Sequence, residues 1–500
     1  MLQQGIVLPP VLERPAETLL VNVFDQETRV AVLEDENACE IHIERQAGRG
    51  LVGNVYLGTV NRVLPGMQSA FIDIGLERSA FLHIVDTVEH RRNPNSTRRI
   101  EQIMFEGQVV PVQVVKDPIG NKGARVSTQL SLAGRFLVHL PQDDHIGVSQ
   151  RIEDDFERNR LREALRNMMM EKGEANGFII RTGADGISEE ELRADFEYLC
   201  SVKKRIEENA RTKPAPYLLH QDLPLHLRVL RDIFNKQTRQ VWVDDKAAYE
   251  EMCQFAGQYA QNANNKIVLF DKKEKTLFGA FGIEEEIRRA LYPRVNLKVG
   301  GYLVIEPTEA MTTIDVNTGG FVGRHNFDET ILKTNLEACH AIARELRLRN
   351  IGGMIIVDFI DMAGAGHREL VLQELAKALS YDRTRVTLNG FTSLGLVEIT
   401  RKRMRESLYH LLSQDCPYCH GRGHIKTMQT VCYEILREIR RAADQEYIKE
   451  LRVYAAPNVV EMLIDEEAEA FRALCDSIDK QVSLSAESAY TQEQFDIVAS

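Results

Sequence analysis

The 500-residue sequence predicts a multidomain protein of α/β and β class, in which a small barrel is combined with α/β units. Five short strands separated by polar turns lie between residues 53 and 130, which is typical of a barrel of the OB type. Strand and helix patterns alternate over 225–270 and again over 291–412, as in α/β domains. The chain length corresponds to roughly three domains of ordinary size.

The expected elements follow one another in a simple order. A proline-containing leader over residues 1–15 is expected to be disordered. The segment Ser188-Glu-Glu-Glu191 is a capping box, so a long helix is expected to begin there. Strands are expected at 19–24, 28–33, 39–43, 53–60, 69–74, 79–84, 109–115, 124–130, 240–244, 266–270, 302–306, 311–316, 354–359, 385–389 and 395–400. The other helices are expected at 225–234, 247–259, 329–349 and 367–379.

The composition excludes several classes of protein. No uninterrupted apolar run of about 18 residues is present, so a membrane span is not expected. The formal net charge of −12 argues against a generally basic coat for nucleic acid, so any contact with RNA or DNA must use local patches. The eight cysteines are scattered and do not form a disulfide framework, which favours a reducing, cytoplasmic location.

Two aspartates stand at the ends of short apolar strands, Asp315 in Met311-Thr-Thr-Ile-Asp315 and Asp358 in Met354-Ile-Ile-Val-Asp358. The chain between them has room for one helix and its loops, so the two strands are expected to be parallel neighbours with both carboxylates at one edge of the sheet. Ligands of open α/β sheets bind at that edge. Two carboxylates in apolar surroundings are costly, and a bound Mg²⁺ or Mn²⁺ would offset their repulsion.

Two further side chains belong to this candidate metal site. Asn317 lies two residues beyond Asp315 on the same strand face and is expected to orient that carboxylate by a hydrogen bond. Asp361 is either a further ligand or a strand cap. The alternative for the whole group is that these are ordinary turn and cap aspartates at strand ends.

The segment Cys416-Pro-Tyr-Cys-His-Gly-Arg-Gly-His424 is a candidate zinc knuckle. Glycines after a CxxC pair suit the tight turn that presents two thiolates to Zn²⁺, but a structural zinc needs four ligands. Either His420 or His424, with or without Cys432, completes the site within the chain, or a second subunit supplies another pair. A thioredoxin-like redox site is a weaker alternative, because the pair does not open a helix after a strand.

Three other groups point to nucleic acid. Aromatic and basic residues of the barrel would form a stacking platform for single-stranded RNA, although a phenylalanine in a strand is more often part of the core. They are Phe71, Phe81, Lys116, Lys122 and Arg125. Arg181 and Thr182 combine a guanidinium with a hydroxyl, which suits a phosphate. The basic segment Arg401–Arg405, together with Arg344, Arg347 and Arg349, either contacts an RNA backbone or forms a solvated helical face.

Taken together, these residues make the chain resemble the ribonuclease E/G family of bacterial endoribonucleases, from about Ala16 to the C-terminus. The most specific stretches are Gly53-Asn-Val-Tyr-Leu-Gly58, Ser69-Ala-Phe-Ile-Asp-Ile-Gly75, Glu309-Ala-Met-Thr-Thr-Ile-Asp-Val-Asn317, Ala343-Arg-Glu-Leu-Arg-Leu-Arg-Asn350, Ile356-Val-Asp-Phe-Ile-Asp-Met362 and Cys416-Pro-Tyr-Cys-His-Gly-Arg-Gly423.

The resemblance implies roles for individual residues. Asp315 and Asp358 match the Mg²⁺-binding aspartates of the family, and Asn317 matches the residue that orients the first. Cys416 and Cys419 match the zinc-link pair, which in the family meets the same pair of a partner subunit. A homodimer is therefore implied, and a dimer of dimers stays an open alternative. The RNA-contacting positions of the OB domain are matched by Phe71, Phe81 and Lys122, and Lys116 is assigned to the same surface. The 5′-monophosphate sensor is matched by Arg181 and Thr182, with Gly134, Val138, Arg151 and Arg385 in or around it.

The resemblance also implies the domain plan. A ribonuclease-H-like domain would be split between 16–49 and 227–290, with an OB domain (50–128) and a 5′-sensor domain (129–226) inserted into it. A DNase-I-like catalytic domain (291–412), a zinc-link (413–426) and a small C-terminal α/β domain (427–500) would follow.

The implied activity is Mg²⁺-dependent cleavage of single-stranded RNA, in maturation of ribosomal RNA 5′ ends and in decay of messenger RNA. It would be stimulated by a 5′-monophosphate and would leave 5′-phosphate and 3′-hydroxyl ends. A non-catalytic RNA-binding or ribosome-associated protein of the same fold is the alternative from another class. Such a protein would be free to lose Asp315 or Asp358, and both are present. A DNA-directed phosphodiesterase is a third possibility, since an OB surface accepts either nucleic acid.

Overall fold

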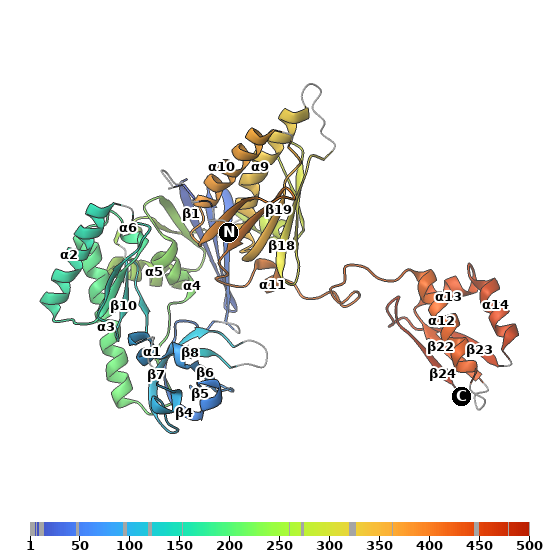
Figure 1. Cartoon of the computed structure of the whole chain (residues 1–500), viewed down its shortest axis with the longest axis horizontal. Helices are drawn as coiled ribbons and strands as arrows, with labels where there is room; N and C mark the ends of the chain where they lie inside the picture. The colour runs from blue at the N-terminus through green and yellow to red at the C-terminus, as the bar shows by residue number, and fades with distance from the viewer. Residues whose placement is uncertain are drawn as a thin grey trace. The chain divides into compact units, whose positions relative to one another are not determined.

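The computed structural model describes residues 6, 8–9, 15–46, 50–93, 98–118, 123–152, 154–259, 261–271, 275–319, 327–362, 364–444, 450–478 and 480–499. The chain divides into two compact units, residues 1–409 and 410–500 (Figure 1). Among the described residues, no helix is long and apolar enough to cross a membrane.

A closed barrel forms the first part of unit one. Its strands are β4 (Val55–Leu64), β5 (Ser69–Asp73), β6 (Ala80–His83), β7 (Val109–Lys116) and β8 (Arg125–Ser127). They pair in the order β4-β5-β6-β8-β7, and β7 pairs back onto β4. Buried residues such as Ile72, Leu82 and Val126 fill its interior. The five-stranded barrel that the sequence predicts is therefore confirmed, and β13 (Tyr217–His220) adds a further strand along β4.

A second sheet combines strands that are far apart in the sequence, and we call it the split sheet. Its order is β15 (Ile267–Leu269), β14 (Thr238–Val243), β1 (Glu17–Val23), β2 (Glu27–Glu34) and β3 (Asn37–Arg45). Strand β1 runs antiparallel to β2 and parallel to β14. Helix α5 (Lys246–Tyr259) contributes Met252 and Ala256 to the same core. The part of unit one around the split sheet also contains α4 (Leu225–Arg228), continued by a π-helical turn at Val229–Ile233, and α6 (Gln261–Asn264).

The third sheet, the β12 sheet, follows the barrel. Its order is β11 (Ile146–Val148), β12 (Gly177–Ile180), β10 (Leu137–Leu140) and β9 (Leu132–Ala133). It shares a core with α2 (Asp155–Lys172) and α3 (Glu189–Thr212). The predicted capping box opens α3, because Ser188 Oγ accepts a hydrogen bond from Glu191 N at 3.2 Å and the Glu191 carboxylate accepts one from Ser188 N at 3.3 Å.

The fourth sheet carries the two strand-end aspartates, and we call it the aspartate sheet. Its order is β16 (Arg294–Asn296), β17 (Tyr302–Pro307), β18 (Met311–Asn317), β19 (Gly353–Asp358), β21 (Leu396–Arg401) and β20 (Val386–Phe391). Helices α9 (Phe327–Leu348) and α10 (Ala365–Ser380) lie together on one side of it (Figure 1) and pack their buried residues onto Ile314, Ile355 and Val357. The other side, which we call the open face, carries the alternate residues of each strand. Shorter helices of unit one are α1 (Val88–Arg92), α7 (Leu277–Ala280) and α8 (Ile283–Ala290), and α11 (Leu408–Leu412) lies where the two units meet in the sequence.

The leader differs from the expectation of disorder at the positions that the structure describes. Ile6 N donates a hydrogen bond of 2.7 Å to Leu388 O, on the edge strand β20. Ile6 and Leu8 pack against the core of the aspartate sheet. The physical reason is that β20 has a free edge and that these two apolar side chains gain from burial beside it. Most of the other leader residues lie outside the described part.

Unit two contains a small three-stranded sheet. Its order is β23 (Gln481–Ala486), β22 (Glu450–Ala455) and β24 (Phe495–Ala499). Its helices are α12 (Met428–Ala443), α13 (Pro457–Ile464) and α14 (Ala468–Ser477). Val431, Ile435, Leu451 and Val459 are fully buried in its core. The CxxC segment precedes α12 in the same unit.

Candidate active site

Asp315 and Asp358 are register partners on neighbouring parallel strands, β18 and β19. The predicted parallel pairing, with both carboxylates at one edge, is therefore confirmed. Their sequence neighbours Ile314 and Val357 are buried under α9 and α10, so strand alternation directs both aspartates to the open face. Both carboxylates are exposed there. The expectation of apolar surroundings is wrong, because the helices cover only the other side of the sheet.

The two carboxylates have different partners. Asn317 Nδ2 donates to Asp315 Oδ2 at 2.8 Å, which is the hydrogen bond that the spacing of these residues predicts. Partial burial and the negative charges of Asp315 and Asp361 raise the pKa of Asp358. Like charges therefore meet at this edge, and a bound cation would offset their repulsion.

The donor set fits Mg²⁺ better than a metal that needs a complete protein cage. Among the described residues, no group of three or more His, Cys, Asp or Glu side chains is arranged to hold a metal ion. Mg²⁺ typically takes one or two carboxylates and completes its six positions with water and substrate phosphate. Asp315 and Asp358 supply that number of carboxylates, so the residues fit a magnesium site that substrate completes.

A second cluster lies where β12 ends. Arg181 and Thr182 follow β12 directly, and Ser149 follows the parallel strand β11. The hydroxyl groups of Thr182 and Ser149 are 2.8 Å apart. The Arg181 guanidinium donates to Gly134 O and, at 3.0 Å, to Asp232 Oδ1. This cluster joins a cation and two hydroxyl groups at one partly exposed position, and these are donor types that can bind a phosphate.

Two neighbours shape this cluster. A Cβ on Gly134 would lie 2.5 Å from the Asp195 carboxylate, so only glycine fits there without displacement. The Asp195 carboxylate is buried and accepts hydrogen bonds of 2.8–2.9 Å from the backbone N–H groups of Arg135, Phe136 and Leu137. These bonds fix the turn between β9 and β10. Although burial raises the pKa of Asp232, the charges of Arg231 and Arg181 hold it below its usual value.

The remaining predicted sensor residues lie on β10, on the loop after β11 and on the loop after α10. Val138 is half-buried in β10 and pairs with Ile179 of β12. Arg151 Nη1 donates to Arg383 O at 3.0 Å, which brings the loop after α10 against the cluster. Arg385 lies in this loop, where its carbonyl accepts a hydrogen bond from Lys402 N at 3.0 Å. The structure thus joins segments that are more than 200 residues apart in the chain.

The predicted aromatic residues of the barrel lie in one row across it. Phe71 and Phe81 are cross-strand partners, with ring centroids 5.9 Å apart and planes at 65°. Both are half-buried, whereas Ala70, Ile72 and Leu82 fill the interior, so the rings lie on the outer face. The register continues from Phe81 to Arg125 and from Arg125 to Lys116. Lys122 lies outside the described residues.

Sequence reasoning missed one member of this row. Arg62 is exposed and pairs with Phe71 at the far end. A bulge between Val60 and Arg62 shifts the register there, so simple alternation along β4 does not reveal its position. Arg125, in contrast, is already bound to Asp86 at 2.7 Å.

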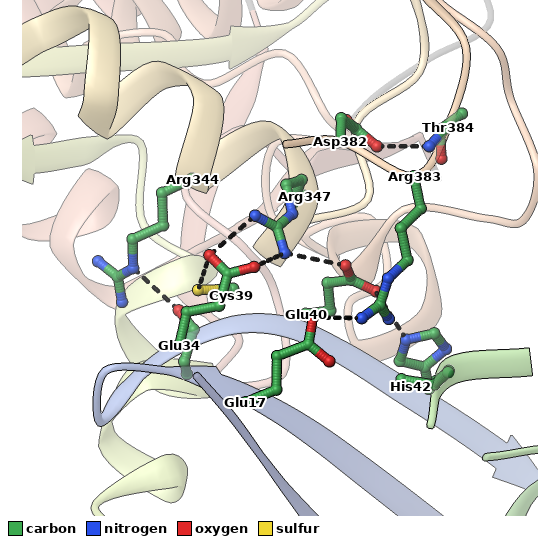
Figure 2. A network of polar contacts seen from close by, with 12 residues as sticks. Glu17, Glu34, Cys39, Glu40, His42, Arg344, Arg347, Asp382, Arg383 and Thr384 are labelled. Atoms are coloured by element: carbon green, nitrogen blue, oxygen red, sulfur yellow. Dashed lines mark hydrogen bonds and ion pairs between the residues drawn. The ribbon is translucent and has the colours of Figure 1, made fainter. Parts of the chain in front are cut away.

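Three arginines of the basic cluster predicted to contact RNA are buried instead, whereas Lys402, Arg403 and Arg405 of the same cluster are exposed. Arg347 on α9 donates to Glu34 and Glu40 of the split sheet, and Figure 2 shows its guanidinium between these two carboxylates. Arg349 donates to Glu345 at 2.6 Å, and Arg401 donates to Asp382 at 2.7 Å. Each of these arginines pairs with at least one carboxylate, because a buried cation is costly without a partner. The RNA-contact and the solvated-face hypotheses are both wrong for Arg347, Arg349 and Arg401.

Figure 2 also shows the neighbouring part of this network. Arg383 donates to Glu17 Oε1 at 2.6 Å and lies 3.9 Å from Glu40 Oε2. Glu17 is 1% exposed, so the charge of Arg383 is needed to compensate it. The network therefore holds α9 and the loop after α10 against the split sheet.

The CxxC segment of unit two forms a tight turn. His420 N donates to Cys416 O at 2.7 Å and Arg422 N donates to Cys419 O at 2.9 Å. His420, Gly421 and Gly423 have positive φ angles of 49°, 81° and 76°. Backbone N–H groups of Cys419 and Tyr418 lower the pKa of the Cys416 thiol, which favours the thiolate that a metal needs.

Two alternatives for this pair can be decided. Cys432 is fully buried and its Sγ contacts Val459 O at 3.7 Å, so it cannot complete a local zinc site. The pair also lies in a turn and not at the start of a helix, unlike a thioredoxin-type redox pair. Two thiolates at an exposed turn fit half of a tetrahedral zinc site.

Known proteins match nearly the whole chain. A model described as "Ribonuclease E/G family" matches residues 131–404, and one described as "RNase E/G, Thioredoxin-like domain" matches residues 415–500. Ribonuclease G of Haemophilus influenzae is 48% identical over 491 residues, covering 97% of this chain and 99% of that protein. Ribonuclease G of Escherichia coli K12 is 48% identical over 487 residues, covering 96% of this chain and 99% of its own length. Ribonuclease E of a Nostoc species is 38% identical over 405 residues, which are 80% of this chain and 58% of that protein.

These matches include the strands that carry the aspartate pair, the cluster after β12 and the cysteine turn. This chain therefore belongs to the ribonuclease E/G family.

Proposed function

We propose that this chain is a Mg²⁺-dependent endoribonuclease that cleaves single-stranded RNA. The observation that carries the proposal is the pairing of Asp315 with Asp358 on the open face, supported by Asn317. The reaction class follows from the family and from relatives named ribonuclease G and ribonuclease E: the chain is a hydrolase that acts on RNA.

The aspartate pair would hold the metal. Bound Mg²⁺ supplies charge to polarise the scissile phosphate and to activate a water molecule. Asp315 and Asp358 would bind it through carboxylate oxygens, and Asn317 fixes Asp315 by the 2.8 Å hydrogen bond. Attack by water would leave a 5′-phosphate and a 3′-hydroxyl.

The barrel row would select single strands. Phe71 and Phe81 present ring surface on the outer face, and Lys116 adds an exposed cation. Bases stack on such rings only when they are not paired in a duplex. Lys122 is assigned to the same surface by resemblance.

The cluster after β12 would bind the 5′-monophosphate. Arg181 and the hydroxyl groups of Thr182 and Ser149 are grouped for a terminal phosphate. Gly134, Val138, Arg151 and Arg385 would shape the pocket. A 5′-end held there raises the effective concentration of the remaining RNA at the aspartate pair.

The cysteine turn would join two subunits. Cys416 and Cys419 supply two of four zinc ligands, and the same pair of a second chain would supply the others. We assign the enzyme to the cytoplasm as a homodimer that acts on precursors of ribosomal RNA and on messenger RNA. In domain terms, the split sheet is the ribonuclease-H-like domain, and the aspartate sheet is the DNase-I-like catalytic domain.

The proposal is tested with a defined single-stranded RNA that carries a 5′-monophosphate. The parent should cleave it with Mg²⁺ and not with EDTA, and Asp358→Asn should not cleave it. Mapped product ends should carry 5′-phosphate and 3′-hydroxyl groups. Binding without cleavage by the parent would favour the non-catalytic RNA-binding protein, and equal cleavage of single-stranded DNA would favour the DNA-directed enzyme.

A further inference from the structure

Arg294 lies on the open face, in the same cross-strand row as the aspartate pair. It belongs to the edge strand β16 and pairs with Val304 of β17, which pairs with Asp315 of β18. Val295, the next residue, packs against the core under the helices, so Arg294 points to the opposite side. Since adjacent strands are about 4.8 Å apart, the two backbone positions are separated by about 10 Å.

The Arg294 side chain is held in place from two directions. Its Cζ lies 3.9 Å from the centroid of the Tyr302 ring. Its Nε donates to Asn296 Oδ1 at 3.2 Å. Tyr302 is in turn the register partner of Asn317, the residue bonded to Asp315. A stacked guanidinium is preorganised and keeps its terminal N–H groups available.

The charge of Arg294 is not neutralised within the described part of the chain. It is exposed, and no described carboxylate lies within ion-pair distance of it. Arg344 and Arg347, also in unit one, both pair with carboxylates. An uncompensated planar cation near the proposed metal-binding carboxylates can bind a phosphate group through two N–H groups and so orient the ligand that carries it.

We propose that Arg294, stacked on Tyr302, binds a backbone phosphate of the RNA next to the scissile bond. The proposal rests on the proposed endoribonuclease function and adds a positioning residue to it. The other explanation is that Arg294 only keeps the edge strand β16 from pairing with other chains, as edge charges do.

A measurement of RNA binding separates the proposed role of Arg294 from the cleavage step. The probe is a fluorescent single-stranded RNA with a 5′-monophosphate, measured by anisotropy in the Asp358→Asn background so that it stays intact. Arg294→Ala should raise Kd about tenfold, the effect of losing one charged hydrogen bond. The slope of log Kd against log salt should fall by about 0.7, the value for one phosphate contact on a single strand.

Three further variants make the result specific. Arg294→Lys should retain the salt slope but bind less tightly than the parent, because it keeps the charge without the planar stack. Tyr302→Phe should bind like the parent, and Tyr302→Leu should lose affinity. The matched control is Arg288→Ala, which removes an exposed arginine that pairs with Glu285 on α8 and should leave Kd unchanged.

Kinetics in the active protein complete the test. Arg294→Ala should raise KM about tenfold and leave kcat within about twofold, because the contact acts on binding. An unchanged Kd and salt slope for Arg294→Ala, with a parent that cleaves RNA, would overturn the role of Arg294 while the proposed function stands. A parent that does not cleave RNA would instead reject the proposed function.

Discussion

Asp315 and Asp358 lie side by side on two neighbouring parallel strands, and among the described residues only Asp315 has an amide, that of Asn317, bonded to it. The pair is therefore asymmetric. One carboxylate is held by a neighbouring side chain, and the other carries a raised pKa because of partial burial and the charges around it. In the proposed magnesium site, the first would fix the metal in position and the second would gain most from the charge of the metal.

Replacement of Asp358 by asparagine should separate activity from stability. Cleavage should fall by more than about a hundredfold, as for loss of a group that stabilises developing charge. In EDTA, the free energy of unfolding should rise by about 0.2–1 kcal/mol, because a like-charged cross-strand pair is removed. Urea denaturation measures this rise. Mg²⁺ should raise the Tm of the parent and not that of the variant. An equal rise in both would place the metal elsewhere.

Replacement of Phe81 by alanine should weaken RNA binding without unfolding the barrel. The ring is half-buried on the outer face, so the expected loss is about 1–3 kcal/mol of binding free energy from stacking. Anisotropy with a single-stranded RNA measures it, and a thermal melt checks the fold. Phe81→Tyr is the matched control and should bind normally. If alanine lowers the Tm but not the affinity, the ring is only a packing residue.

Replacement of Arg181 by alanine should remove the preference for a 5′-monophosphate. The parent should cleave a 5′-monophosphorylated RNA faster than the same RNA with a 5′-hydroxyl, and the variant should cleave both at the slower rate. Arg166→Ala removes an exposed arginine on α2 and serves as the control. A preference that survives in Arg181→Ala would exclude this cluster as the sensor.

Replacement of Cys416 by serine should release zinc and dissociate the dimer. Metal content and the mass of the assembly by light scattering measure the two effects together. Cys432→Ala changes a fully buried cysteine and should keep the metal and the mass of the parent. A variant at Cys416 that remains a zinc-containing dimer would contradict the inter-subunit clasp.

Replacement of Arg347 by alanine should destabilise unit one strongly. Arg347 is 7% exposed, and the loss of its side chain leaves Glu34 and Glu40 without this cation. Breaking a buried ion pair on one side costs about 3–5 kcal/mol. The exposed Arg288→Ala should change the free energy of unfolding by less than about 0.5 kcal/mol. A small effect of Arg347→Ala would mean that water reaches this network.

The geometry of the aspartate pair could be predicted from the sequence, because it depends on neighbouring residues within each strand and on one crossover between the strands. The alternation of Ile314, Asp315 and Val316 defines the face, and one crossover helix between two strands makes them parallel neighbours. The capping box of α3 is equally local, since Ser188 and Glu191 bond each other's backbone.

The features that could not be predicted from the sequence depend on partners that are far apart in the chain. Arg347 resembles a member of a surface patch until Glu34 of β2 and Glu40 of β3 supply its carboxylates, and Arg344 pairs with Glu286 of α8. Arg151 meets Arg383 only because the β12 sheet packs beside the loop after α10. Arg294 gave no signal in the sequence, because its position depends on three strands in register.

The split sheet has a consequence for synthesis of the chain. Strand β1 is made first, but its partner β14 begins 221 residues later, at Thr238 compared with Glu17. At about 5–20 residues per second, β1 waits roughly 10–40 s with one edge unpaired. The barrel and the β12 sheet are complete before β14 is made and can fold in that interval. A ribosome pause or a chaperone that acts between residues 45 and 238 would therefore influence the yield of this protein more than one acting later.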